Sequence, residues 1–345
     1  MTATLPIGIN LDGVLVHDGL PTPDMATRFA MVAEAGVFDY VERNPEPGED
    51  LTPYRALCDR HGLPMRVMGG SFIAGRDDDR AARGIAQAVG FGARVFNCQL
   101  FARHADGHPL SDAEVVAFYL WLLELGARGG VPCLPCLEIH VDMWSEDARR
   151  VARVAHALER EGVTPALTLD VSHLIYKIDN PPELAAAGLA DDVASGALVL
   201  DPGSPRAVFR QWIERGWVRH AHARSASPNG LPNPWMALAP GVPGRGIQYP
   251  FVAPPPGTYH AAWHPGQLAP WKAAMRHLLD WRATHPEAPG QVSCEFIPFP
   301  DYGGGARYSI LDNNIACARW LRQAWTERCA DSAPVSQPAF QDIAS

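Results

Sequence analysis

The stretch "VTPALTLDVSH", residues 163–173, changes character near its end. Ala166, Leu167 and Leu169 are apolar, as expected for a buried strand, but Asp170 follows directly and His173 lies three residues further on. A carboxylate or an imidazole at the edge of a core is costly unless it has a partner. The stretch therefore predicts a buried strand whose end lies beside other polar groups of the chain.

Short apolar segments of this kind recur along the chain and alternate with predicted helices. Eight such strands are typical of an α/β protein with a (β/α)₈ TIM barrel. A doubly wound open sheet is the alternative, but no G-x-G-x-x-G follows the first strand to support it. The eight predicted strands are residues 6–10, 37–42, 63–68, 93–99, 132–138, 165–170, 217–222 and 291–296.

Several predicted helices carry signals at both ends. Ser111 and Glu114 form a capping box at the start of one helix. Three other helices are predicted to begin at a hydroxyl residue followed by proline and to end at a glycine. These pairs are Thr22-Pro23 with Gly36, Thr52-Pro53 with Gly62, and Ser204-Pro205 with Gly216.

Two segments lie outside the regular barrel pattern. Residues 223–265, after the seventh predicted strand, are rich in proline and glycine and are too long for a simple connection. We predict that they form an ordered flap over the barrel mouth, where they shape substrate choice. The chain is thus predicted to be one barrel domain, residues 1–328, followed by an irregular C-terminal tail, residues 329–345.

The charge of the chain restricts its partners. The formal net charge of -9 disfavours nucleic acid and anionic lipid, because the mean field of the protein repels polyanions. No run approaches 18 apolar residues, and the N-terminal sequence has neither a basic leader nor a long hydrophobic region. These features predict a cytoplasmic protein that contacts no membrane. A homo-oligomer or an accessory subunit is compatible with the sequence.

The seven cysteines form an odd, scattered set, which fits reduced thiols better than a disulfide framework. Cys133 and Cys136 form one C-x-x-C, and a redox or zinc role is conceivable for this pair. There is no second pair to complete a zinc knot, and the segment reads as a buried strand. We therefore interpret the pair as structural.

Four predicted strands end on a polar residue after an apolar run. In a parallel barrel the ends of neighbouring strands lie at one face, so these side chains are expected to converge. Three carboxylates in a partly dry pocket would repel one another unless a cation balanced them. Three oxygen ligands and one imidazole suit a hard or borderline ion such as Mn²⁺ or Mg²⁺, with Co²⁺ or Zn²⁺ as alternatives. The ligand types alone do not select among these ions, and Mn²⁺ is the ion we expect. The predicted metal ligands are Glu138, Asp170, His222 and Glu295.

The register of the seventh strand leaves one ligand open. His220 and His222 alternate, so both point to the same side of the strand. The pattern therefore does not decide which of the two contacts the ion.

With E, D-x-x-H, H-x-H and E at successive strand ends, the chain resembles the xylose-isomerase-like TIM barrels over residues 6–325. That superfamily includes sugar isomerases, ketose 3-epimerases, inosose dehydratases and apurinic endonucleases. The resemblance places the metal ligand on His222. It implies that His173 binds substrate beside the metal and that Arg224 anchors a distal hydroxyl or carboxylate.

The resemblance and the chemistry of the residues predict a sugar or polyol isomerase or epimerase. A metal ion that polarises a carbonyl eases removal of the neighbouring C–H proton, and a carboxylate is a suitable base. Glu138 and Glu295 come from the fifth and eighth strands and could address opposite faces of a ketose through an enediolate. Glu42 and Gln99, at the ends of the second and fourth strands, are predicted to contact the substrate.

Some features depart from the family pattern. The endonuclease branch adds histidines after the second to fourth strands, and the segments "VMGGSF" and "NCQLFA" lack them, so a trinuclear site is not expected. His140 follows Glu138 by two residues and could act as an extra catalytic base. This fits a lyase related to inosose or dehydroshikimate dehydratases or to C-glycoside deglycosidases. A non-catalytic ligand-binding barrel is the third alternative.

Overall fold

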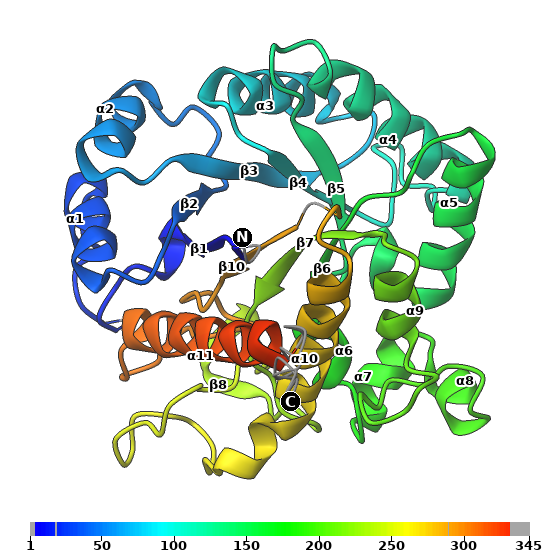
Figure 1. The fold of residues 1–345 in the computed structure, drawn as a ribbon. Coiled ribbons are helices and arrows are strands. Elements are labelled where there is room, and N and C mark those ends of the chain that lie inside the picture. The colour runs from blue at the N-terminus through cyan, green and yellow to red at the C-terminus, as the bar shows by residue number, and fades with distance from the viewer. Residues whose placement is uncertain (1–3, 18, 289, 332–345) are drawn as a thin grey trace, which may run out of the picture.

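Eight parallel strands form a closed barrel in the order β1-β10-β7-β6-β5-β4-β3-β2 (Figure 1). The computed structural model describes residues 4–17, 19–288 and 290–331. All eight predicted strands are present, which confirms the (β/α)₈ barrel. Their bounds are β1 Ile7–Asn10, β2 Tyr40–Arg43, β3 Met65–Phe72, β4 Val95–Leu100, β5 Leu134–Glu138, β6 Leu167–Asp170, β7 Val218–Ala223 and β10 Gln291–Cys294.

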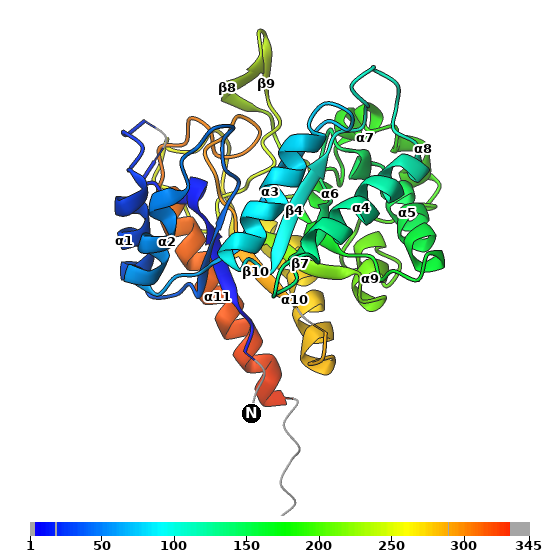
Figure 2. The same cartoon turned by 90° about the horizontal axis from the view of Figure 1, so that it is seen from above.

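Helices surround the barrel and cover the outer faces of the strands (Figures 1 and 2). The long ones are α1 Met25–Ala35, α2 Thr52–His61, α3 Asp78–Phe91, α4 Asp112–Gly126, α5 Ala148–Arg160, α9 Val208–Glu214, α10 Ala269–Thr284 and α11 Ile310–Asp331. The short ones are η1 Leu11–Gly13, η2 Trp144–Glu146, α6 Ser172–Ile175, α7 Pro181–Ala186, α8 Ala190–Ala194 and η3 Pro265–Leu268. No described helix combines the length and hydropathy that crossing a bilayer requires.

The capping signals were only partly correct. The capping box at the start of α4 is confirmed, and Gly36 and Gly62 end their helices at positive φ. The predicted N-cap of α1 was wrong, because the Asp24 carboxylate accepts the Thr27 N–H at 2.8 Å and caps the helix itself. Helix α2 begins at Thr52 as predicted, although Thr52 is its first residue and Leu51 is the N-cap. The predicted start at Ser204-Pro205 was wrong, because these residues form a turn before α9.

A tyrosine fills the middle of the barrel. Gly8 on β1 pairs with Tyr40 on β2, and a side chain on Gly8 would overlap the Tyr40 ring. The ring is fully buried, and its hydroxyl lies 3.0 Å from Ser293 Oγ on β10. Because alternate strand residues share a face, Glu42 projects into the barrel on the same side as Tyr40. The Tyr40 ring therefore lies in the barrel interior, two residues before Glu42 on the same strand.

The connection between β7 and α10 contains a hairpin, β8 Asn233–Ala239 and β9 Val242–Gly244. The hairpin projects away from the barrel (Figure 2). Its base is fixed to the loop after β10, because Asn233 Nδ2 donates to the carbonyls of Pro300 and Gly304 at 3.2 and 2.8 Å. Gly244 packs so closely on the Pro300 carbonyl that a side chain there would overlap it. The β7–α10 connection and the β10–α11 loop are thus packed together.

Helix α11 continues to Asp331. The predicted start of an irregular tail at residue 329 was therefore wrong by one helical turn. The helix persists because Leu321 and Ala324 of its last turns pack in the core. The rest of the predicted tail, residues 332–345, lies outside the described residues.

Candidate metal centre

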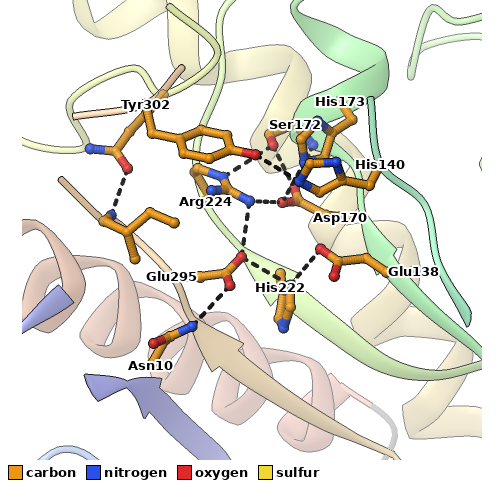
Figure 3. A network of polar contacts seen from close by, with 12 residues as sticks. Asn10, Glu138, His140, Asp170, Ser172, His173, His222, Arg224, Glu295 and Tyr302 are labelled. Atoms are coloured by element: carbon orange, nitrogen blue, oxygen red, sulfur yellow. Dashed lines mark hydrogen bonds and ion pairs between the residues drawn. The ribbon is translucent and has the colours of Figure 1, made fainter. Parts of the chain in front are cut away.

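Four side chains from consecutive strands converge at the C-terminal end of the barrel (Figure 3). They are the four predicted ligands, and one nitrogen or oxygen of each lies within 4.8 Å of those of the others. All four are buried, with Glu295 the most exposed at 3%. The parallel register explains the convergence, because each residue lies at the end of its strand or one residue from it. These residues are Glu138, Asp170, His222 and Glu295.

Glu138 is held by two amides from β4. Its Oε2 accepts hydrogen bonds from Asn97 Nδ2 at 2.7 Å and Gln99 Nε2 at 2.8 Å. Its Oε1 lies 3.0 Å from His222 Nδ1. Gln99 also accepts a hydrogen bond from Ser71 Oγ at 2.5 Å. The structure therefore places Gln99 against the Glu138 carboxylate, where it fixes the orientation of one candidate ligand.

Asp170 is fixed by the turn that follows its strand. Its Oδ1 accepts hydrogen bonds from the backbone N–H and the hydroxyl of Ser172, at 3.0 and 2.6 Å. Its Oδ2 forms a short ion pair with Arg224 Nη2 and lies 3.3 Å from His173 Nε2. The D-x-x-H motif thus brings its carboxylate and imidazole together.

Glu295 follows β10 and faces both strand β1 and strand β7. Its Oε1 accepts a hydrogen bond from Asn10 Nδ2 at 3.0 Å. Its Oε2 lies 2.9 Å from His222 Nδ1 and accepts a hydrogen bond from Arg224 Nη2 at 2.9 Å. Arg224 therefore bridges two of the candidate ligands, while its Nη1 is buried without a hydrogen-bond partner.

The two histidines of β7 occupy different positions. His222 Nδ1 faces the carboxylates of Glu138 and Glu295, whereas His220 Nε2 lies 3.3 Å from Glu42 Oε2. His222 therefore lies among the carboxylates of Glu138, Asp170 and Glu295, whereas His220 lies outside that group, next to Glu42. Glu42 also contacts His222 Nε2, at 2.9 Å through its other oxygen. This geometry favours His222 over His220 as the ligand.

A second cluster forms the upper wall of the site (Figure 3). The rings of His140 and His173 lie 4.0 Å apart, centroid to centroid. His140 Nδ1 lies 2.6 Å from the Val141 carbonyl, so Nδ1 carries the proton and Nε2 is free to accept one. Tyr302 Oη donates to that Nε2 at 2.8 Å, and the Tyr302 ring stacks 3.8 Å from the Arg224 guanidinium.

Sequence reasoning missed Tyr302. It lies in "PDYGGG", seven residues after Glu295, in the loop between β10 and α11. The only signal was an aromatic residue in a glycine-rich segment close to a strand end, which is too common to single out. Asn97 was also absent from the predicted site, although it holds Glu138. Asn10, at the end of the first strand, was a weaker candidate for substrate contact, and the structure places it against Glu295.

The charges of the cluster are strongly perturbed. Burial lowers the pKa of His222, but Glu295, Glu42 and Glu138 outweigh it and raise that pKa well above 6.5. Burial alone would raise the pKa of Glu138, but His222 outweighs it and holds the value at about 2. Burial raises the pKa of Glu295 above its usual value despite His222 and Arg224. The two glutamates therefore differ in their affinity for a proton.

The histidines of the upper wall are neutral at physiological pH. Burial is the main cause, and the neighbouring His173 adds to it, so that the pKa of His140 falls to about 4. Burial also lowers the pKa of His173, although Asp170 opposes the shift. Two neutral imidazoles next to a phenol form a wall that can accept protons as well as hydrogen bonds.

The residues present fit a divalent cation. Four buried carboxylates, those of Glu42, Glu138, Asp170 and Glu295, gather here, and among the described residues Arg224 is the arginine or lysine that forms ion pairs with any of them. Three carboxylate oxygens and one imidazole nitrogen are a ligand set for Mn²⁺, Mg²⁺, Co²⁺ or Zn²⁺, and do not distinguish among them. The supporting amides and hydroxyls fix the carboxylates in the way that outer partners orient metal ligands.

Neither protein-family models nor curated protein sequences match this chain, whereas solved structures do. An L-ribulose 3-epimerase superposes with a TM-score of 0.53 at 15% identity, covering 97% of this chain and 100% of that one. The IOLI protein with a zinc atom gives 0.52 at 12% identity, covering 96% and 100%. The predicted resemblance to xylose-isomerase-like TIM barrels is thereby confirmed at the level of the fold.

Proposed function

We propose that this protein is a divalent-metal-dependent enzyme that isomerises or epimerises a sugar or polyol derivative by proton transfer next to a carbonyl. The convergence of three buried carboxylates and His222 at the C-terminal end of the barrel carries this proposal. That end of a TIM barrel is where reactive groups lie. The ion would be held by Glu138, Asp170, His222 and Glu295, and Mn²⁺ is the first ion to test.

When bound, the ion would polarise the carbonyl of the substrate and lower the cost of removing the adjacent C–H proton. The two glutamates divide the proton transfer. They reach the site from two different strands, β5 and the end of β10, so that one would accept the proton and the other would return one. Removal on one face and return on the other through an enediolate inverts the carbon and leaves the mass unchanged.

The test starts from the purified chain. Metal analysis and calorimetric titration with Mn²⁺ and Zn²⁺ establish whether it binds an ion. Incubation with a panel of ketoses and cyclic polyol ketones in D₂O then reports exchange at the carbon next to the carbonyl. Exchange in the metal-loaded protein that disappears after chelation supports the proposal. Absence of metal binding contradicts it.

The matched control is Glu49→Gln, because Glu49 lies in the loop after β2 and contacts Arg43 and Tyr54 away from the cluster. We expect Glu295→Gln to abolish exchange and Glu49→Gln to retain it. If ligands bind with equal affinity before and after chelation and no exchange occurs, a non-catalytic barrel is the better description.

A lyase is the second candidate, and the contact between His140 and Tyr302 favours it. Elimination needs a proton donor for the leaving group in addition to the base at carbon. The Tyr302 hydroxyl would be such a donor once its hydrogen bond to His140 Nε2 is exchanged for one to the leaving group, and the positive charge of Arg224 beside its ring would stabilise the phenolate that remains. Product mass separates the candidates, because loss of water or of an aglycone indicates the lyase. In that case Tyr302→Phe should stop the loss of water or of the aglycone, while deuterium exchange at the carbon next to the carbonyl persists.

A further inference from the structure

Glu42 lies behind His222 on the side away from the three carboxylates. Its Oε1 is 2.9 Å from His222 Nε2, while His222 Nδ1 faces Glu138 and Glu295. The Glu42 side chain is fully buried. The two nitrogens of His222 therefore face different partners. Nε2 faces Glu42, and Nδ1 faces the candidate ligands Glu138 and Glu295.

This arrangement selects one tautomer. An ionised carboxylate only accepts hydrogen bonds, so Nε2 must carry the proton that faces Glu42. A neutral imidazole then presents its lone pair on Nδ1, which is the nitrogen that faces the other ligands. Metal-binding histidines commonly have their second nitrogen held by a carboxylate, which fixes the ring and the tautomer.

His220 holds Glu42 in turn. Its Nε2 lies 3.3 Å from Glu42 Oε2, and its ring meets the His222 ring edge to face at 5.0 Å. Both oxygens of Glu42 are thus taken by histidines of β7, and none of its surface is exposed to a ligand. The short side-chain spacing of alternate residues on β7 makes this possible, because both imidazoles point into the barrel.

We propose that Glu42, supported by His220, is a positioning residue that fixes the tautomer and orientation of His222 for metal binding through Nδ1. This inference rests on the proposed metal-dependent function, and it replaces the expectation that Glu42 contacts the substrate. The predicted consequence is a direct effect on metal affinity that requires no substrate.

The experiment compares wild type, Glu42→Gln, His220→Gln and the control Glu49→Gln as metal-stripped full-length proteins. Titration calorimetry with Mn²⁺ and with Zn²⁺ gives the Kd of each. In Glu42→Gln the new side-chain amide could donate to Nε2 of His222 and so favour the wrong tautomer. We expect this variant to bind the ions about 10-fold to 100-fold more weakly. His220→Gln should have a smaller effect, and Glu49→Gln none.

A second measurement separates positioning from mere stability. Two-bond ¹H–¹⁵N correlation spectra of the Zn²⁺ complex report the protonation of each imidazole nitrogen. Wild type should show a histidine with a protonated Nε2 and a metal-bound Nδ1, and this signature should be lost in Glu42→Gln. If Glu42→Gln does not fold, the same comparison with His220→Gln decides.

Two results would overturn the inference. Equal affinity of wild type and Glu42→Gln for both ions removes Glu42 from any role in binding and leaves the metal site intact. Coordination of Zn²⁺ through Nε2 of His222, instead of through Nδ1, would also overturn the inference. If wild type binds neither ion, the proposed metal-dependent function fails and this inference fails with it, which is a distinct outcome.

Discussion

The two ends of the barrel differ in what they bring together. At the C-terminal end, acidic and histidine side chains from five strands form hydrogen bonds and ion pairs in a buried cluster. At the N-terminal end, a cavity of about 710 Å³ lies between the first strands and α11. Among the described residues that line it, the one carboxylate is Asp39, which pairs with Arg322 at 2.9 Å.

The two ends therefore differ in the kind of residue that they gather. The cavity at the N-terminal end is mostly apolar, and its one described carboxylate is paired with an arginine. The C-terminal end gathers groups whose proton affinities are shifted in opposite directions, which is the arrangement that acid-base chemistry needs.

The sharpest test of this comparison is one substitution at each end. Glu295→Gln removes a candidate ligand and proton carrier, so turnover should fall by about 10²-fold to 10⁴-fold. Arg66→Met, in the lining of the other cavity, should leave turnover unchanged. Steady-state kinetics on the first substrate that shows exchange provides the measurement. Equal losses in the two variants would contradict the division between the ends.

The next largest effect concerns stability of the cluster. Arg224→Ala leaves the buried carboxylates without their permanent counter-ion, which typically costs about 3–5 kcal/mol. Urea unfolding of the metal-free variant should show this loss. A saturating divalent ion should restore part of it, because a ligand that binds only the folded state stabilises it. A loss of equal size with and without the ion would argue against electrostatic balance as the cause.

The pH dependence of the free energy of unfolding tests a buried histidine at the C-terminal end of the barrel. The folded-state pKa of His140 is about 4, below its ordinary value of 6.5. Between these values the unfolded chain takes up a proton and the folded chain does not, so stability falls as pH falls from 6.5 to 4. His140→Asn should reduce this slope. Urea midpoints of the two metal-free proteins across the window measure it, with identical slopes as the contrary result.

The smallest effect is expected at the N-terminal end. Arg322→Ala removes an exposed ion pair with Asp39 and hydrogen bonds to the Val37 carbonyl. Surface pairs contribute about 0.2–1 kcal/mol, so unfolding should change by about that amount. Metal affinity should stay the same. A large change in metal affinity would mean that the two ends communicate.

The barrel was predictable because its strands are short apolar runs separated by glycine-terminated helices, a local pattern that the fold preserves. The four strand-end residues were predictable for the same reason, since parallel strands bring their ends together. Helix starts were less predictable. Asp24 competed with Thr22 as a cap, and sequence alone cannot rank two neighbouring acceptors.

The supporting contacts of the site were beyond sequence reasoning. Glu42 and His222 are 180 residues apart, and Tyr302 reaches His140 from a distance of 162 residues. Such contacts depend on side-chain rotamers and loop paths rather than on period or spacing. Glu42 was selected as a strand-end residue, but its two histidine partners could be identified only in three dimensions.

The ring of Tyr40 has a final consequence. It reaches from β2 to Ser293 on β10 and lies buried in the barrel interior, on the N-terminal side of the strand-end residues. Arg66, which lines that cavity, lies against the lower side of the same ring. The Tyr40 ring thus lies between the two ends of the barrel interior. Under the proposed function, a substrate that reaches the strand-end residues would enter and leave at the C-terminal face of the barrel.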